Sequence, residues 1–227
     1  MFVVPCKYIE QSTIRECVDS ILKYHPEEKV MIVDSFSEDD SYLKQFKDYE
    51  RVDIFDQKNS EYPPGALIKV MKSCDEKSYT LIHDSTVMLS SIQSFIDDEV
   101  EARPFWWYVE AFPWFAHQPW VGKYIIDVLN KSKYEIPDMQ KQFYAVPFHH
   151  CTITNSMAKK ILDSGIGDNF YLRNKWDDHA WQRLLGIIFA QENYPANEYS
   201  IIGESRPETD HSNNKYANKM FLNRDVV

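Results

Sequence analysis

Residues 79–86 run Tyr79-Thr80-Leu81-Ile82-His83-Asp84-Ser85-Thr86, a short stretch of strand-forming side chains that ends at a carboxylate. Two earlier stretches follow the same plan, since residues 30–33 lead into Asp34 and residues 52–55 lead into Asp56. Short apolar runs bounded by polar residues are typical of buried strands. One Asp in such a place is an ordinary turn former or helix cap, but three in succession favour a ligand-binding edge.

Helices are predicted between these strands. Residues 2–4 form a first strand that stops at Pro5-Cys6-Lys7, and the next apolar residues recur at helical spacing, at Ile14, Cys17, Val18, Ile21 and Leu22. Thr13 and Glu16 predict a capping box at the start of that helix. Two more helices are predicted, over residues 42–49 and from Pro63 onward. Alternating strands and helices indicate a mainly parallel sheet flanked by helices, with ligands at the carboxyl ends of its strands.

The second half of the chain is less regular. Helices are predicted over residues 91–100, 124–129 and 156–162, and from Asp177 or Asp178 to Phe189. Strands are predicted over residues 143–146, 151–154 and 199–202. No repeat or low-complexity linker interrupts the chain, so we expect a single α/β domain over residues 1–227, with halves at 1–90 and 91–227.

Composition excludes several classes of partner and cofactor. A formal net charge of −10 makes nucleic acid a poor partner, and no apolar run approaches the length of a membrane span. The four cysteines form no CxxC pair, which favours reduced thiols and a cytoplasmic location. With six glycines and neither a G-x-G-x-x-G nor a P-loop motif, an NAD-type dehydrogenase and a P-loop enzyme are both disfavoured. A diphosphate would instead need a metal ion, Lys or Arg.

The order of these motifs resembles that of GT-A glycosyltransferases, particularly the family-2-like nucleotide-diphospho-sugar transferases. The first strand ends in Pro5-Cys6-Lys7 and leads into an amphipathic helix, and the second ends in Asp34. Asp84-Ser85-Thr86 stands where that family has its D-x-D motif. Trp176-Asp177-Asp178-His179 opens a helix where the family has an acidic E-D or D-D motif.

The resemblance implies a role for each matched residue. Asp34 would receive the base or ribose of the nucleotide, with Asp56 and Lys58 near the same pocket. The donor edge would include Pro5, Cys6, Lys7, Ser85 and Thr86, and Asp84 would face the ribose and a metal ion. Asp177 or Asp178, with Asp178 slightly preferred, would be the general base that deprotonates the acceptor hydroxyl.

The D-x-D motif lacks its second carboxylate, because Thr86 replaces it. A hard cation such as Mn²⁺ or Mg²⁺ prefers carboxylates to a hydroxyl. Asp84 therefore binds the metal alone with waters and phosphates, or another group helps, or the protein works without metal. In some members of the family a C-terminal His completes the metal shell, and His211 is the candidate by position.

Aromatic and histidine residues supply the candidate acceptor site. The aromatic block is best explained by core packing or by cover of a sheet edge, and the functional alternative makes Trp106, Trp107 and Trp114 stacking platforms for sugar rings. His149 and His150 are candidates to line the acceptor pocket. As neighbours on a strand they would point to opposite faces, which argues against a zinc site with Cys151. Possible diphosphate contacts are Lys58, Arg173, Lys175 and Arg206, and Asp177-Asp178 is also explained as a plain helix start.

The expected function is transfer of a sugar from a nucleotide donor to an acceptor hydroxyl, with inversion. A UDP-sugar is the favoured donor and a GDP-sugar a possible one, and the acceptor is a glycan or another hydroxyl compound. Two alternatives stay open: a sugar-phosphate nucleotidyltransferase, and a non-catalytic module that binds a nucleotide sugar or glycan. The sequence leaves the oligomeric state open.

Overall fold

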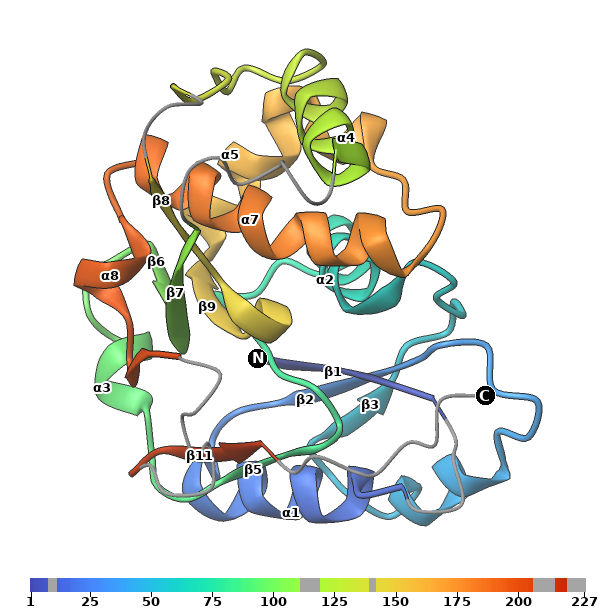
Figure 1. Cartoon of the computed structure of the whole chain (residues 1–227). Helices are drawn as coiled ribbons and strands as arrows, with labels where there is room; N and C mark the ends of the chain where they lie inside the picture. Colours follow the sequence, from blue (N-terminus) through green and yellow to red (C-terminus); the bar gives the residue numbers. More distant parts are fainter. Residues whose placement is uncertain (8–11, 111–118, 139–141, 206–214, 220–227) are drawn as a thin grey trace.

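A central six-stranded sheet organises the computed structural model, which describes residues 1–7, 12–110, 119–138, 142–205 and 215–219 (Figure 1). The strands lie in the order β3-β2-β1-β4-β9-β6. Their bounds are Val52–Ile54 for β3, Val30–Asp34 for β2, Phe2–Cys6 for β1, Ser78–Leu81 for β4, Cys151–Thr154 for β9 and Ala102–Pro104 for β6. The predicted fold class, an α/β protein with a mainly parallel sheet flanked by helices, is confirmed.

One strand of the six, β9 from the second half of the chain, runs opposite to the others. β1 pairs in parallel with β2 and β4, and β2 pairs in parallel with β3. β9 then pairs antiparallel with β4 and with β6. Strands from both halves therefore share one sheet, and the hydroxyls of Thr80 and Thr152 lie 3.0 Å apart across the junction.

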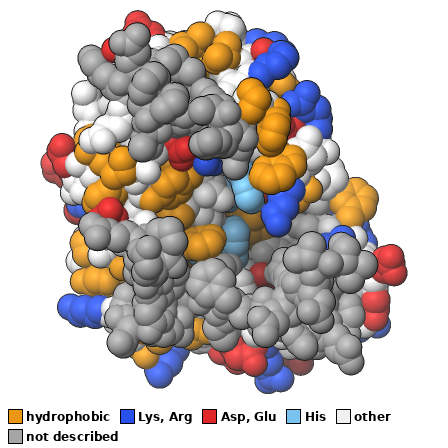
Figure 2. Space-filling model, viewed as in Figure 1, with side chains coloured by type: hydrophobic (Ala, Val, Ile, Leu, Met, Phe, Trp, Pro, Cys, Tyr) orange, Lys and Arg blue, Asp and Glu red, His pale blue; other side chains and the backbone are white. Residues whose placement is uncertain are grey.

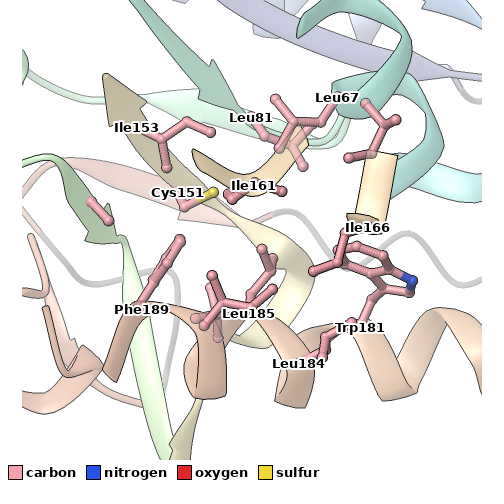
Figure 3. Packing of buried hydrophobic residues seen from close by; sticks show 14 of the residues in the cluster. Leu67, Leu81, Cys151, Ile153, Ile161, Ile166, Trp181, Leu184, Leu185 and Phe189 are labelled. Carbon is pink, nitrogen blue, oxygen red and sulfur yellow. The ribbon is translucent and has the colours of Figure 1, made fainter. Parts of the chain in front are cut away.

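Helices cover both faces of the sheet (Figure 1). The strand β1 shows the alternation, because Phe2 and Val4 belong to one apolar cluster and Met1 and Val3 to the other. Helix α1 (Ile14–Tyr24) packs on the first face. On the second face lie α2 (Tyr62–Ser73), α4 (Pro119–Leu129) and α7 (Lys175–Gln191). Figure 3 shows α7 residues, among them Trp181 and Leu185, packed toward Leu81 and Cys151 of the sheet.

Two smaller sheets and several short helices complete the described structure. One sheet has the order β10-β7-β8 and the other pairs β11 with β5. The strands are β5 (Thr86–Met88), β7 (Trp106–Glu110), β8 (Phe143–Ala145), β10 (Gly203–Glu204) and β11 (Ala217–Lys219). The short helices are η1 (Ser41–Phe46), α3 (Gln93–Ile96), η2 (Pro147–His149), α5 (Asn155–Ile161), η3 (Leu162–Ile166), α6 (Gly167–Asn169) and α8 (Ala196–Tyr199).

The structure corrects the predicted helix over residues 91–100, which is shortened to α3. Asp98 Oδ1 accepts a hydrogen bond of 3.0 Å from the backbone N–H of Val100, and its other oxygen binds Arg103. A carboxylate that binds the N–H two residues onward forms an Asx turn, which bends the chain away from a helix. Local side-chain chemistry thus overrides the apolar pattern.

The predicted strand over residues 199–202 is wrong. Tyr199 ends helix α8, and the β10 strand begins only at Gly203. The N–H groups of Ile201 and Ile202 do donate hydrogen bonds of 2.9 Å to Pro104 and Phe105, so this segment follows the neighbouring chain without forming a ladder.

The predicted capping box at the start of α1 does not form either. Thr13 makes no side-chain cap bond to the helix. Its hydroxyl instead donates a hydrogen bond of 3.1 Å to the backbone carbonyl of Asp84. Helix α1 therefore holds the segment that follows β4.

Helix α7 approaches strand β8 so closely that one position requires glycine. A Cβ atom built on Gly186 would overlap the backbone carbonyl oxygen of Tyr144. Close by, the N–H of Val146 donates a hydrogen bond of 2.8 Å to the Gln182 carbonyl of α7. Both partners in this contact are backbone groups, so neither can move without shifting the helix from the sheet.

We expect Gly186→Ala to lower the free energy of unfolding by about 3 kcal/mol, because overpacking at a backbone contact outweighs the gain of about 1 kcal/mol in helix propensity. Urea unfolding followed by circular dichroism measures this. The control Ala190→Gly changes an exposed position of the same helix and should cost only about 1 kcal/mol. Equal or greater stability of Gly186→Ala would contradict the close approach.

Candidate functional site

A cavity of about 660 Å³ lies at the carboxyl ends of β1, β2 and β4. The start of α7 and the turn before β9 form its other side. Figure 2 shows histidine side chains in a hollow between apolar and basic residues on this face of the molecule. The lining comprises Pro5, Cys6, Lys7, Ser35, Phe36, Asn59, Ser60, Tyr62, Pro63, His83, Asp84, Phe148, His149, Lys175, Asp178, His179 and Gln182.

The structure brings Asp84 and Asp178 to the same cavity. They come from distant parts of the chain, the segment after β4 and the first turn of α7. Asp84 is buried, with 7% of its surface exposed. Below it, the Sγ of Cys17 donates to the His83 carbonyl at 3.6 Å, so α1 supports this segment at two points together with Thr13.

The donor set around Asp84 does not complete a divalent metal site in the described part of the chain. No group of three or more His, Cys, Asp or Glu side chains is placed there to hold a metal ion. Thr86 begins strand β5, and its buried Oγ1 has no hydrogen-bond partner among the described residues. The other metal candidate, His211, lies outside the described residues. The Mn²⁺ or Mg²⁺ site stays a prediction.

Asp34 organises the loop after β2 and does not line the cavity. Its carboxylate accepts hydrogen bonds from the Ser37 hydroxyl at 2.5 Å and from the Tyr42 hydroxyl at 2.9 Å. Lys58 Nζ lies 3.6 Å away, and both Lys58 and Asp56 are exposed outside the cavity lining. Neighbouring Ser35 and Phe36 are the residues of this loop that reach the cavity.

Cys6 and Tyr42 extend this buried hydrogen-bond chain into the cavity wall. The Sγ of Cys6 lies 2.9 Å from the Tyr42 hydroxyl. Since that hydroxyl donates its one proton to Asp34, the thiol is the donor to Tyr42. Burial raises the pKa of Cys6 far above its ordinary value, so it lines the cavity as a neutral thiol.

His149 lies in a turn of unusual backbone conformation. Phe148 and His149 have φ angles of 57° and 59°, in the left-handed region that side chains other than glycine seldom adopt. The Nε2 of His149 lies 2.8 Å from the backbone carbonyl of Asp178, to which it must donate, and 3.6 Å from Asp178 Oδ1. The prediction that His149 and His150 are neighbours on a strand is wrong, because β9 begins at Cys151.

His150 supports the chain segment that leads to the cavity. It is fully buried, and its Nε2 accepts a hydrogen bond of 3.0 Å from the backbone N–H of His83. The two histidines therefore differ in place: His149 lines the cavity beside Asp178, whereas His150 fixes the segment that leads to Asp84.

Asp177 and Asp178 have different surroundings at the start of α7. Asp177 is buried and forms a two-point ion pair with Arg173, with distances of 2.8 Å and 3.1 Å. Asn174 caps the helix by accepting from the N–H groups of Trp176 and Asp177. Asp178 lines the cavity, its side chain is 13% exposed, and its Oδ1 has no hydrogen-bond partner among the described residues.

The aromatic candidates fall into three places. Trp106 is buried, with 1% exposed, so it offers no open ring face in this structure. Trp107 packs edge-on against Tyr144, with ring centroids 5.3 Å apart. Trp114 lies outside the described residues, as does Arg206.

Three cavity residues, Phe36, Tyr62 and His179, were not among the site residues predicted from the sequence. Phe36 and Tyr62 are exposed by 56% and 37% and have φ angles of 58° and 52°. His179 follows Asp178 directly, and burial lowers its pKa below the ordinary value, which favours a neutral ring at neutral pH. The position of His179 next to Asp177 and Asp178 in the sequence could have indicated a role in the site. A positive φ angle at Phe36 or Tyr62, by contrast, cannot be recognised from composition or spacing.

Comparison with known proteins finds a family model that matches the N-terminal part of the chain. Residues 2–86 match the family model described as glycosyl transferase family 2. This match confirms the predicted resemblance over the segment from β1 to the start of β5. No curated protein sequence matches the chain.

Solved structures give more distant likenesses. Residues 1–349 of TarS from S. aureus are 17% identical, with a TM-score of 0.38, and the match covers 45% of this chain and 34% of that one. GalNAc-T7 with UDP, GalNAc and Mn²⁺ is 14% identical, with a TM-score of 0.38 and coverage of 48% and 22%. The galactosyltransferase LgtC with donor and acceptor sugar analogues is 10% identical, with a TM-score of 0.47 and coverage of 83% and 70%. The chain thus spans about a third of the TarS fragment it matches.

Among the helices of the described ranges, none combines the length and apolar character that crossing a bilayer requires.

We expect the cavity thiol Cys6 to resist alkylation in the folded protein. It is 3% exposed, and Cys17 and Cys151 are also buried, whereas Cys74 is partly exposed. Because the thiolate is the reactive form, raised pKa and burial both slow the reaction. Timed iodoacetamide labelling at pH 7.5, read by peptide mass spectrometry, should modify Cys74 first and the other three only after addition of urea. Labelling of Cys6 as fast as Cys74 in native buffer would refute this arrangement.

Proposed function

Since residues 2–86 are of glycosyl transferase family 2 type, we propose that this chain transfers a sugar from a nucleotide diphosphate donor to an acceptor hydroxyl, with inversion. A UDP-sugar is the favoured donor, and a GDP-sugar is the second choice. The observation that supports this most directly is that Asp84 and Asp178 line one cavity at the carboxyl edge of the sheet. That edge is where open α/β sheets bind their ligands.

The donor would lie along the segments that follow β1, β2 and β4. Phe36 and Tyr62 offer exposed rings beside the cavity for contact with the nucleobase. Lys7 and Lys175 line the cavity, and neither forms an ion pair with a carboxylate in the described ranges. Their ammonium groups would therefore be available to the diphosphate, whose charge grows as the bond to the sugar breaks.

Asp178 would act as the general base. As the acceptor oxygen attacks the anomeric carbon, its proton passes to the Asp178 carboxylate, and the nucleoside diphosphate leaves with the electrons of the broken bond. His149 donates to the backbone carbonyl of Asp178 and lies against its carboxylate, so it would fix the orientation of the base. Asp177 is committed to Arg173 and would hold the start of α7 in place.

The proposed mechanism does not require a metal ion, and the Mn²⁺ or Mg²⁺ site stays a prediction. The described residues offer Asp84 without a complete ligand set, so no step above depends on Mn²⁺ or Mg²⁺. Assays in Mn²⁺ and in EDTA, run side by side, decide whether the predicted requirement holds.

We expect UDP to raise the melting temperature of the protein, because a ligand that binds only the native state stabilises it. Thermal shift with UDP, GDP, CDP and dTDP, in Mn²⁺ and in EDTA, measures this, and Asp84→Ala should remove most of the shift. Slow release of UDP or GDP from a nucleotide sugar supports the transferase. Glycan binding without any release supports a non-catalytic module, and pyrophosphate from a nucleoside triphosphate and sugar phosphate supports a nucleotidyltransferase. The absence of any shift would contradict nucleotide binding itself.

We expect Asp178→Asn to lower kcat for transfer by about 10²–10⁴-fold while UDP still binds, since general base catalysis contributes about that factor. The matched control is Asp177→Asn, which breaks an ion pair with a partly exposed Arg173. This change should cost about 1 kcal/mol of stability and leave kcat within about tenfold of the parent. The reverse ranking of the two variants would assign the base to Asp177.

A further inference from the structure

Two exposed tryptophans face each other at the starts of α4 and α7. Trp120 is 48% exposed and Trp176 is 46% exposed, and their ring centroids are 5.8 Å apart at an interplanar angle of 66°. Exposed indole rings cost free energy in water, because their large apolar faces stay hydrated. Neither residue is required by the apolar clusters that hold the sheet and helices together.

This tryptophan pair, Trp120 and Trp176, is continuous with the cavity. The ring of Trp176 contacts that of His179 edge-on at 5.6 Å, and His179 lines the cavity one residue after Asp178. Lys175, the neighbour of Trp176, also lines the cavity. A molecule that rests on the pair can therefore extend directly to the proposed base.

The pair is held on a rigid base. The Asn174 side chain accepts a hydrogen bond of 2.8 Å from the backbone N–H of Trp176. Helices α4 and α7 are joined by a buried hydrogen bond of 2.8 Å from the Trp181 indole to the Tyr124 hydroxyl. Preorganised rings lose little freedom when a ligand binds, so the two indoles are suited to recognition.

Buried polar atoms in the adjoining cavity indicate what kind of ligand the cavity and the pair would receive together. Asp178 Oδ1 and His149 Nδ1 have no hydrogen-bond partner among the described residues. Asp178 Oδ1 is an acceptor, and Nδ1 is the ring nitrogen of His149 that does not bind the Asp178 carbonyl. Such polar atoms in the cavity, together with flat apolar faces beside it, call for a ligand with several hydroxyl groups and an apolar C–H face. A sugar ring has both.

We propose that Trp120 and Trp176 bind a sugar ring of the acceptor, so that the acceptor is a saccharide and not a peptide or lipid hydroxyl. This inference rests on the proposed function, in which Asp178 takes the proton of the acceptor. The ring nearest the base would offer its hydroxyl to Asp178, and the next ring would stack on the indoles.

A glycan array with the labelled full chain, in the presence of UDP, tests this assignment. We expect binding to one or more immobilised oligosaccharides, with about tenfold weaker binding for Trp176→Ala and Trp120→Ala and near-parent binding for Trp176→Phe, which keeps an aromatic face. The control Ile136→Ala removes an equally exposed apolar side chain, 42% exposed, from beyond the other end of α4 and should bind as the parent does.

Binding of UDP, measured by calorimetry on the same proteins, separates this inference from the proposed function. UDP binding with no glycan bound, or equal glycan binding by the parent and both Ala variants, overturns the saccharide site and leaves the donor site standing. Loss of UDP binding by the parent itself would instead contradict the proposed function. Transfer to a Ser- or Thr-containing peptide but to no oligosaccharide, or a dimer in gel filtration that Trp176→Ala dissociates, also overturns the assignment.

Discussion

The antiparallel pairing of β4 with β9 is the contact on which the site depends. It aligns Leu81 with Cys151, so the chain that leaves β4 toward Asp84 lies beside the chain that enters β9 from His149. The His150 ring then accepts the N–H of His83 across this junction. Without this pairing, the carboxylate after β4 and the histidine turn would have no fixed relation, and the cavity would lose one wall.

The helices on the two faces of the sheet contribute different parts of the site. Helix α1 supports the segment after β4 from one side, through Thr13 and Cys17. Helix α7 packs on the other side, held close to β8 at Gly186. The first turn of α7 therefore reaches the cavity from the face opposite α1, and Asp178 and Asp84 line the same space.

Much of the fold could be predicted from the pattern of apolar residues, because burial determines that pattern. The four runs of the first half form strands where expected. Those of β1, β2 and β4 are buried along their whole length, as strands covered on both faces are, whereas the edge strand β3 is exposed at Asp53 and Ile54. The site depends on contacts that sequence patterns do not show: Arg173 pairs with Asp177, whereas Asp178 lies in the cavity beside His149. The strand predicted over residues 199–202 failed for a similar reason, since this segment hydrogen-bonds to Pro104 and Phe105 far away in the sequence. The helix predicted over residues 91–100 failed for a local reason, the Asx turn at Asp98.

The tryptophans also show that sequence patterns do not predict which side chains are exposed. Trp106 and Trp176 have the same side chain, and a sequence places both near motifs of interest. Only the packing distinguishes the 1% exposure of the first from the 46% exposure of the second. Trp106 of the aromatic block packs against Phe105 and His150 in the core, whereas Trp176 at the start of α7 stays open to solvent.

The turn at Phe148 and His149 has a consequence for how this protein would respond to selection for heat resistance. Two successive side chains in the left-handed region store about 1–3 kcal/mol each. Glycine at Phe148 would relieve part of that strain, but it would also remove the ring that packs against Trp106 and His150, and the lost packing offsets the gain. Selection for a higher melting temperature would therefore retain Phe148, and with it the strained turn that holds His149 beside Asp178.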